Sequence, residues 1–275
     1  MQIQQTLARM IVERLAQNAR EHERNFASPA GRIPTRHLVV DDLLPADIAR
    51  KFYPCFPPRE RMRRLASFRE RKHTFKQLDQ VPGPLKDITF AIQSPEVVSA
   101  IGRITKIPRQ VPDARLYAGG LTLMAEGDFL NPHIDNSHDA DRRLYRTVNL
   151  LYYVSPEWKP EYGGSLELWN DEVRESVVLP SLFNRLVIME THRHSWHSVS
   201  PVRHDGHRCC VSNYYFSERS LDGEDYFHVT SFSARPEQPF RRWFAAADNL
   251  ARMGVRRIFA KGIGKKDLYR PDGPK

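Results

Sequence analysis

Two short segments determine how this chain is organised: Asn131-Pro-His-Ile-Asp135 and His197-Ser-Val-Ser-Pro-Val202. If His133 and Asp135 lie on one strand, the alternation of side chains puts both on the same face. A fold that brings His197 opposite them places two imidazoles and one carboxylate around one point. These groups suit a divalent ion of intermediate softness, and three ligands on one side leave the other side open for substrates. The segments therefore predict a metal site that performs chemistry.

An arginine follows the second segment. Arg208 directly precedes an apolar run, residues 209–216, so we expect it inside the end of a strand, whereas Arg203 belongs to the preceding loop. A guanidinium in that place can hold a carboxylate through a two-pronged, charge-assisted pair. Arg208 is therefore predicted to bind a carboxylate ligand.

From Leu116 onward the pattern changes to short strands separated by turns, which is typical of a sandwich or barrel. The predicted strands are residues 119–124, 132–135, 146–154, 165–169, 173–179, 185–190, 196–202 and 208–216. Eight such strands make a double-stranded β-helix, the jelly-roll topology. The predicted fold class is α+β with a mainly β core. Glycine-rich phosphate loops are absent from the sequence, which excludes the common nucleotide-binding folds.

Four features together resemble the Fe(II)/2-oxoglutarate-dependent dioxygenase superfamily, and within it the prolyl-4-hydroxylase-like branch. They are His133-x-Asp135, the strand entry Gly163-Gly-Ser-Leu-Glu-Leu-Trp169, His197-Ser-Val-Ser-Pro-Val202, and Arg208 at the head of the last strand. The resemblance covers residues 121–217. It implies that His133, Asp135 and His197 are both metal ligands and catalytic residues, and that Arg208 binds the far carboxylate of 2-oxoglutarate.

The implied cofactor is Fe(II), the cosubstrates are 2-oxoglutarate and O2, and ascorbate is a candidate stimulant. The implied reaction hydroxylates an unactivated C–H bond and releases succinate and CO2. Asp135 favours hydroxylation over halogenation, because a carboxylate fills the position that halogenases of this family leave open for chloride. The alternative is a cupin-like binding or isomerase protein without 2-oxoglutarate turnover, which would have no need of Arg208.

One position departs from a common variant of the family, in which a serine follows the basic residue by two. Cys210 stands there, so a second contact to 2-oxoglutarate must come from elsewhere or be missing. Thr147, Asn149 and Tyr153 alternate on one face of the predicted third strand and are the candidates. Ordinary sheet polarity is the competing explanation for all three.

The flanking regions are read from their periodicity. Apolar residues at helical spacing predict an amphipathic helix in residues 1–25, and residues 84–107 predict two helices that meet at Ser94-Pro95. The arginine-rich stretch 59–76 is interpreted as a solvated helix. We expect one catalytic domain, 1–275, with a mainly helical support region at 1–110, the β core at 111–220, and a basic helix and tail at 236–275.

Composition limits the location and the partners. The 275 residues contain no apolar run long enough to span a membrane, the N-terminus does not read as a secretory signal, and three cysteines offer no disulfide framework. A cytoplasmic protein is therefore expected. The two adjacent cysteines, Cys209 and Cys210, are expected on opposite faces of one strand.

The net charge of +9 is concentrated near the C-terminus. Nine Lys or Arg residues lie between Arg241 and Arg270, against two Asp. The tail either presents a solvated basic face or holds the enzyme at the inner face of an anionic membrane, whereas nucleic acid is not favoured because no base-reading module accompanies the charge. Expected substrates are a small molecule, a peptide or protein, or an envelope glycan.

Overall fold

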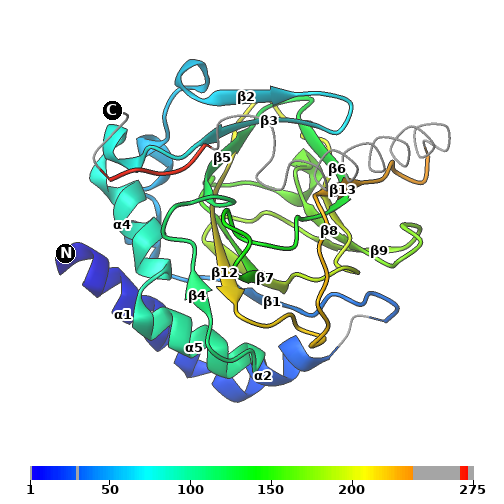
Figure 1. Ribbon diagram of the computed structural model, residues 1–275. Coiled ribbons are helices and arrows are strands. Elements are labelled where there is room, and N and C mark those ends of the chain that lie inside the picture. Colours follow the sequence, from blue (N-terminus) through cyan, green and yellow to red (C-terminus); the bar gives the residue numbers. More distant parts are fainter. Residues whose placement is uncertain (1, 29–30, 238–266, 272–275) are drawn as a thin grey trace.

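The computed structural model describes residues 2–28, 31–237 and 267–271, which form a curled antiparallel sheet with helices on one side (Figure 1). Its helices are α1 Gln2–Gln17, α2 Ala19–Ala27, α3 Ala46–Ala49, α4 Gly83–Ile92 and α5 Pro95–Thr105. Its strands are β1 His37–Val40, β2 Arg63–Ala66, β3 Glu70–Phe75, β4 Val111–Pro112, β5 Gly120–Met124, β6 Phe129–Ile134, β7 Tyr145–Tyr153, β8 Leu166–Trp169, β9 Ser176–Leu179, β10 Arg185–Glu190, β11 His197–Val199, β12 Arg208–Ser217 and β13 Ser231–Phe232.

The sheet runs in the order β1-β10-β7-β12-β5-β3-β6-β11-β8-β9. Strands β10, β7, β12 and β5 form one wall, and β6, β11, β8 and β9 form the other. Every pairing is antiparallel. The predicted double-stranded β-helix in an α+β fold is confirmed, and each of the eight predicted core strands appears, with β10 at the predicted bounds.

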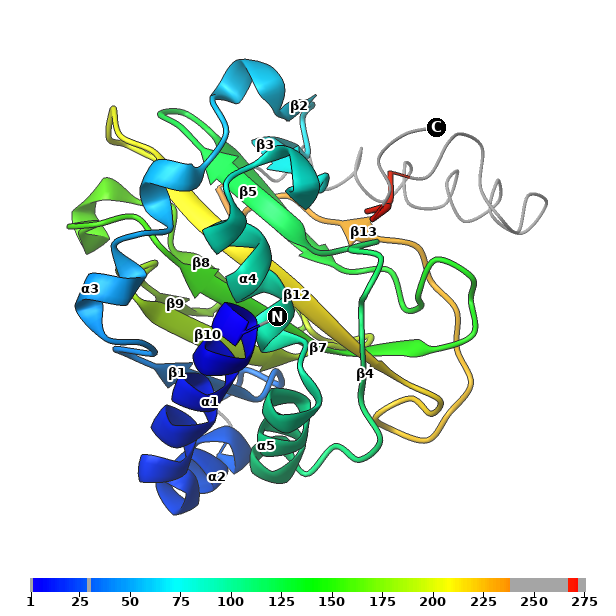
Figure 2. The same ribbon diagram turned by 90° about the vertical axis from the view of Figure 1, so that its left-hand side faces the viewer.

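The helices cover the outer face of the first wall (Figure 2). Helix α1 packs against α4 and α5 and buries Leu7, Ile11 and Leu15, three residues at helical spacing. They share one apolar core with the outward-facing residues Val148, Leu150 and Tyr152 of β7. This layer confirms the predicted N-terminal helices, although Asn18 divides the first into two. The opposite face of the wall is therefore the one that is left for a site.

The adjacent cysteines of β12 show the same division between an outer face under the helices and an inner face. Cys209 belongs to the core beneath the helices, whereas Cys210 packs in a second apolar cluster with Tyr153 and Leu166 on the inner side. Both thiols are free and buried, as the alternation of a strand predicts. Inner and outer faces of β12 can thus be assigned by counting residues from Arg208.

The helix that we predicted in residues 59–76 is wrong. Strands β2 and β3 form a hairpin there, and β3 pairs with β5 and with β6, which links the two walls. Charged residues dominate this stretch and hide the strand alternation, and the open edges of β5 and β6 supply backbone partners that local propensity does not reveal. The correction matters because β3 brings Glu70 and Lys72 beside the inner space.

Two short segments close the fold. Strand β13 pairs with β6, so that Phe232 lies opposite His133. Near the other end of the chain, Lys76 Nζ donates to the carbonyl of Asp267 at 3.1 Å, and Tyr269 packs in the helical core. The predicted basic helix and tail, residues 236–275, fall outside the described residues except for 236–237 and 267–271. Within the described ranges, every helix is too short or too polar to cross a membrane.

Candidate active site

Strands β6 and β11 bring the two predicted histidines together. The antiparallel register sets His197 directly opposite His133, and Asp135 follows the end of β6. His133 Nε2 lies 3.7 Å from Asp135 Oδ1, and His197 Nε2 lies 3.6 Å from Asp135 Oδ2. One ligand atom from each residue fits within a group whose members are all within 4.8 Å of one another. The residues predicted from the two sequence segments therefore converge on one point.

Backbone carbonyls orient both imidazoles. His133 Nδ1 donates to the carbonyl of Asn131 at 3.0 Å, and His197 Nδ1 donates to the carbonyl of Ser195 at 2.9 Å. These bonds select the tautomer whose Nε2 carries a lone pair. The pKa of His133 is lowered to about 3 by burial and then by the neighbouring His197. His133 is therefore neutral at ordinary pH, and its Nε2 can act as a ligand.

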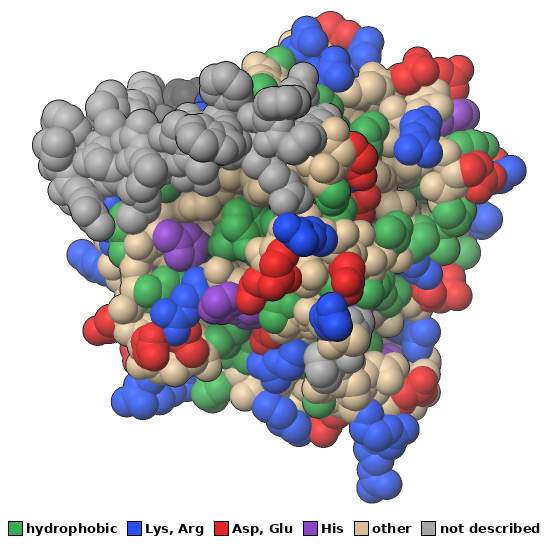
Figure 3. All heavy atoms as spheres, turned by 90° about the vertical axis from the view of Figure 1, so that its right-hand side faces the viewer, with side chains coloured by type: hydrophobic (Ala, Val, Ile, Leu, Met, Phe, Trp, Pro, Cys, Tyr) green, Lys and Arg blue, Asp and Glu red, His purple; other side chains and the backbone are tan. Residues whose placement is uncertain are grey.

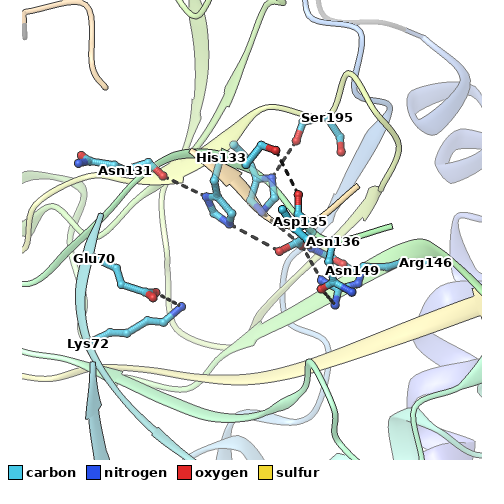
Figure 4. A network of polar contacts seen from close by, with 12 residues as sticks. Glu70, Lys72, Asn131, His133, Asp135, Asn136, Arg146, Asn149 and Ser195 are labelled. Atoms are coloured by element: carbon cyan, nitrogen blue, oxygen red, sulfur yellow. Dashed lines mark hydrogen bonds and ion pairs between the residues drawn. The ribbon is translucent and has the colours of Figure 1, made fainter. Parts of the chain in front are cut away.

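Asp135 is held in its ionised form by donors behind it (Figure 4). Burial by itself raises the pKa of Asp135, but the guanidinium of Arg146, followed by His197 and His133, lowers it well below the usual range. Arg146 Nη1 lies 3.0 Å from Oδ2, and Asn149 Nδ2 donates to the same oxygen at 2.9 Å. Because both donors use Oδ2, Oδ1 stays available for a metal ion.

Arg208 lies on the inner face of β12 and is buried. Its Nε donates to the carbonyl of Gly164 at 3.0 Å and to Ser181 Oγ at 3.2 Å, and its guanidinium lies 4.7 Å from the centre of the Tyr153 ring. Within the described residues, the guanidinium has no carboxylate in ion-pair range. A buried guanidinium without an anion is costly, so the arrangement favours a bound carboxylate.

Steric constraints explain why glycine occupies both positions of the strand entry, Gly163 and Gly164. Gly164 adopts φ +67°, and a Cβ there would come within 3.2 Å of Arg208 Cγ. Gly163 adopts φ +72°, and its Cβ would lie 2.1 Å from the Pro201 carbonyl oxygen. A side chain at Gly163 would force the backbone apart, and one at Gly164 would press on the side chains of Arg208 and Val202 in a conformation that favours glycine. The pair allows the chain to approach Arg208 closely, which explains why the two features occur together.

A cavity of about 280 Å³ connects the three converging residues with Arg208. Its lining includes Thr122, Met124, Leu151, Leu166 and Cys210 between these two ends. These five residues are uncharged, whereas both ends carry charged groups. The cavity therefore suits a short ligand with an anionic group at each end.

The structure places the three further candidates on β7 differently from one another. Asn149 lines the cavity and bonds Asp135, and Tyr153 lies against Arg208. Thr147 does not line the cavity, because its hydroxyl donates to the Tyr215 carbonyl at 3.2 Å. The pairing of β7 with β12 shifts at this point, so that Thr147 is an extra residue between Arg146 and Val148.

This β-bulge explains a residue that sequence reasoning missed. Simple alternation puts Arg146 on the helix side of β7, but the extra residue turns its side chain toward Asp135. Lys72 was also missed, because its strand was predicted as a helix. His192 and His194, which are close to His197 in the sequence, lie away from the site: His192 is beside Glu190, and His194 is exposed beside Asp171. A bulge leaves no clear mark in a single sequence, whereas the alternation Arg208, Cys210, Ser212 and Tyr214 along β12 was readable.

Comparison with known proteins agrees with this geometry. Residues 119–216 match the family model of the 2OG-Fe(II) oxygenase superfamily. The β core belongs to this superfamily. A search among curated proteins produced no match for the chain.

Solved structures share the fold at low sequence identity. A prolyl-4-hydroxylase from Pseudomonas putida is 17% identical, with a TM-score of 0.51, over 72% of this chain and 98% of that one. A Trichoplax adhaerens prolyl hydroxylase in complex with a hypoxia inducible factor peptide fragment is 18% identical, with a TM-score of 0.46, over 79% and 92%. HygX from Streptomyces hygroscopicus, with nickel, 2-oxoglutarate and hygromycin B bound, is 13% identical, with a TM-score of 0.47, over 76% and 96%.

The family model confirms the predicted superfamily, and the solved prolyl-4-hydroxylase from Pseudomonas putida shares the fold. The protein is an Fe(II)- and 2-oxoglutarate-dependent oxygenase, and none of the comparisons supports the cupin-like alternative. The three residues fit iron. Two imidazole nitrogens and one carboxylate oxygen, each from a side chain whose other polar atom is held by a hydrogen bond, are the donor set of this metal class.

Asn149 offers a test of the carboxylate geometry. Asn149→Leu removes the donor to Asp135 Oδ2 with little change in volume, so Asp135 loses one of two restraints and Fe(II) affinity falls about tenfold or more. Thr147→Val is the matched control on the same strand, and its affinity stays within about twofold of the parent. Anaerobic titration of the apoprotein with Fe(II) measures both. A selective loss of 2-oxoglutarate affinity in Asn149→Leu would instead place Asn149 on the cosubstrate.

Proposed function

We propose that His133, Asp135 and His197 bind Fe(II), that Arg208 binds the far carboxylate of 2-oxoglutarate, and that the enzyme hydroxylates an unactivated C–H bond. The whole chain would act as one catalytic domain. The observation that carries the proposal is the pairing of two features in one cavity. A set of metal donors converges at one end, and at the other lies a buried guanidinium with no carboxylate partner among the described residues.

The chain's own residues divide the work. Bound iron supplies the activation of O2 and of 2-oxoglutarate. Arg208 orients 2-oxoglutarate by its far end, and Tyr153 and Ser181 restrain the guanidinium that does so. Asn149 and Arg146 keep Asp135 ionised and turned toward the metal. Thr147 is left without a role in the cosubstrate pocket, so Asn149 and Tyr153 remain the candidates of the three.

Substrate choice belongs to the part of the cavity that neither the metal nor 2-oxoglutarate occupies. We propose a small molecule, a peptide or protein, or an envelope glycan as the substrate class. Such substrates would reach the open side of the metal from the mouth of the cavity. Ascorbate would act on the iron rather than on a protein site.

A peripheral contact with an anionic membrane surface is a separate proposal, which rests on the sequence of the tail. On the face drawn in Figure 3, basic and acidic side chains of the described residues are interspersed, so the basic excess is not concentrated on that face. The nine Lys or Arg residues between Arg241 and Arg270, against two Asp, supply most of that excess, and each basic residue near an anionic surface contributes about 1 kcal/mol.

Cosedimentation with vesicles tests the tail. The parent chain should pellet with anionic vesicles at low salt, and high salt should release it because the attraction is screened. Arg252→Gln, Arg256→Gln and Arg257→Gln combined in the full chain should weaken pelleting about tenfold or more. Arg143→Gln with Lys159→Gln, at exposed positions, is the charge control. Equal recovery in the supernatant with anionic and neutral vesicles leaves the tail as a solvated segment.

The metal ligands are tested by substitution. His133→Ala, Asp135→Ala and His197→Ala should each reduce Fe(II) binding and succinate formation to the level of a metal-free control, while the circular dichroism spectrum is retained. His194→Ala removes an exposed histidine from the loop before β11 and should leave Fe(II) affinity within about twofold of the parent. Full succinate formation by any of the three variants excludes that residue from the site.

Arg208 is tested through the cosubstrate. Arg208→Ala removes a charge-assisted pair worth about 1.5–3 kcal/mol, so the Kd of 2-oxoglutarate rises about tenfold or more, whereas Fe(II) affinity stays close to that of the parent. Arg203→Ala, at an exposed position in the adjoining loop, is the control. If Arg203→Ala raises the Kd and Arg208→Ala does not, the far carboxylate is held at the mouth rather than inside the strand.

A further inference from the structure

Lys72 is a third cation among the described residues that line the cavity, after Arg146 and Arg208. It projects from β3, and its ammonium lies 2.9 Å from Glu70 Oε2. Figure 4 shows this pair side by side across from the converging histidines. Lys72 is one of the residues that line the cavity, whereas Glu70 is not. Lys72 therefore contributes a cation to the cavity wall, and Glu70 pairs with it from the same strand.

The charges of the cavity identify Lys72 as the cation without a task in the reaction with 2-oxoglutarate. Among the described lining residues, the cations are Lys72, Arg146 and Arg208, and the one carboxylate is Asp135. Arg146 pairs with Asp135 at 3.0 Å. Arg208 is assigned to the far carboxylate of 2-oxoglutarate. Among the described lining residues, Lys72 thus carries one positive charge that is assigned neither to Asp135 nor to 2-oxoglutarate, and Glu70 partly balances it.

Two phenols add hydrogen-bond donors to the same cavity. Tyr117 precedes β5 and Tyr214 lies on the inner face of β12, and both line the cavity. Arg146 lies 4.5 Å from the centre of the Tyr214 ring and also interacts electrostatically with Tyr117, so both tyrosines are near the Asp135 end. Neither hydroxyl has a hydrogen-bond partner among the described residues. An ammonium and two free phenols together suit an anion.

We propose that the substrate carries a carboxylate or a phosphate group that binds Lys72, with Tyr117 and Tyr214 as further donors, near the carbon that is oxidised. This inference rests on the proposed function, because it assumes that 2-oxoglutarate occupies Arg208. It names Lys72 as a specificity-determining residue. Glu70 weakens the site for anions by pairing with the ammonium, and it also keeps the free enzyme from presenting an uncompensated charge.

The experiment measures binding of matched probe pairs to the full chain loaded with Mn(II) and 2-oxoglutarate. The pairs are N-acetyl amino acids against their primary amides, and sugar phosphates against the free sugars. The anionic member of at least one pair should bind at millimolar concentration or below, about tenfold tighter than its neutral partner. Preference within the first pairs indicates a carboxylate substrate, and preference within the second indicates a phosphorylated one.

Variants of the ion pair give opposite signs. Lys72→Gln should weaken the preferred anion about tenfold, whereas Glu70→Gln should strengthen it, because the ammonium loses its competitor. Lys159→Gln, at an exposed position, should change nothing. A purely structural role of the pair would predict that Lys72→Gln and Glu70→Gln shift affinity in the same direction.

The proposal is overturned if neutral probes bind as tightly as anions, if no anion binds at millimolar concentration, or if Lys72→Gln leaves anion affinity unchanged. It is also overturned if Lys72→Gln raises the Kd of 2-oxoglutarate about tenfold, since Lys72 would then serve the cosubstrate. Succinate formation by the parent chain without added substrate tests the proposed function separately. An active parent with no preference for anions refutes the substrate class alone.

Discussion

The active site depends on the antiparallel register between β6 and β11, which sets His197 opposite His133. In a sheet, a shift of one residue turns every side chain of a strand to the other face. The register is supported on both sides, because β13 pairs with β6 and β8 pairs with β11. The carbonyls of Asn131 and Ser195 then orient the two imidazoles from their own strands. Backbone geometry thus places the metal donors before any metal binds.

The opposite wall supplies charge and cosubstrate contacts. Along β12 a period of two carries Arg208, Cys210, Ser212 and Tyr214 to the cavity, while the intervening residues pack beneath the helices. On β7 the bulge at Thr147 brings Arg146 onto the same face as Asn149. Strand β12 is regular where the cavity runs along it. Strand β7 is irregular at Thr147, where Arg146 must reach Asp135. The helical layer holds both strands from behind.

Much of the fold and of the site could be predicted from the sequence. The eight core strands and the histidine and aspartate positions are marked by alternation, turn residues and local motifs, which are short-range signals. The β3 strand and the position of Arg146 could not be predicted, for two reasons. Strand β3 forms because β5 and β6 supply open strand edges, and Arg146 faces the site because β7 has a single extra residue against β12. Lys72 was missed because it lies on β3, and so the cation on which the proposed substrate charge rests was missed as well.

The most direct test of the account is a crystal structure of the full chain with Mn(II) and 2-oxoglutarate, prepared without O2. The account predicts a metal ion coordinated by His133 Nε2, Asp135 Oδ1 and His197 Nε2, with the far carboxylate of 2-oxoglutarate paired with Arg208. Metal at other residues, or a far carboxylate bound by Lys72 or Arg203 instead of Arg208, would contradict it.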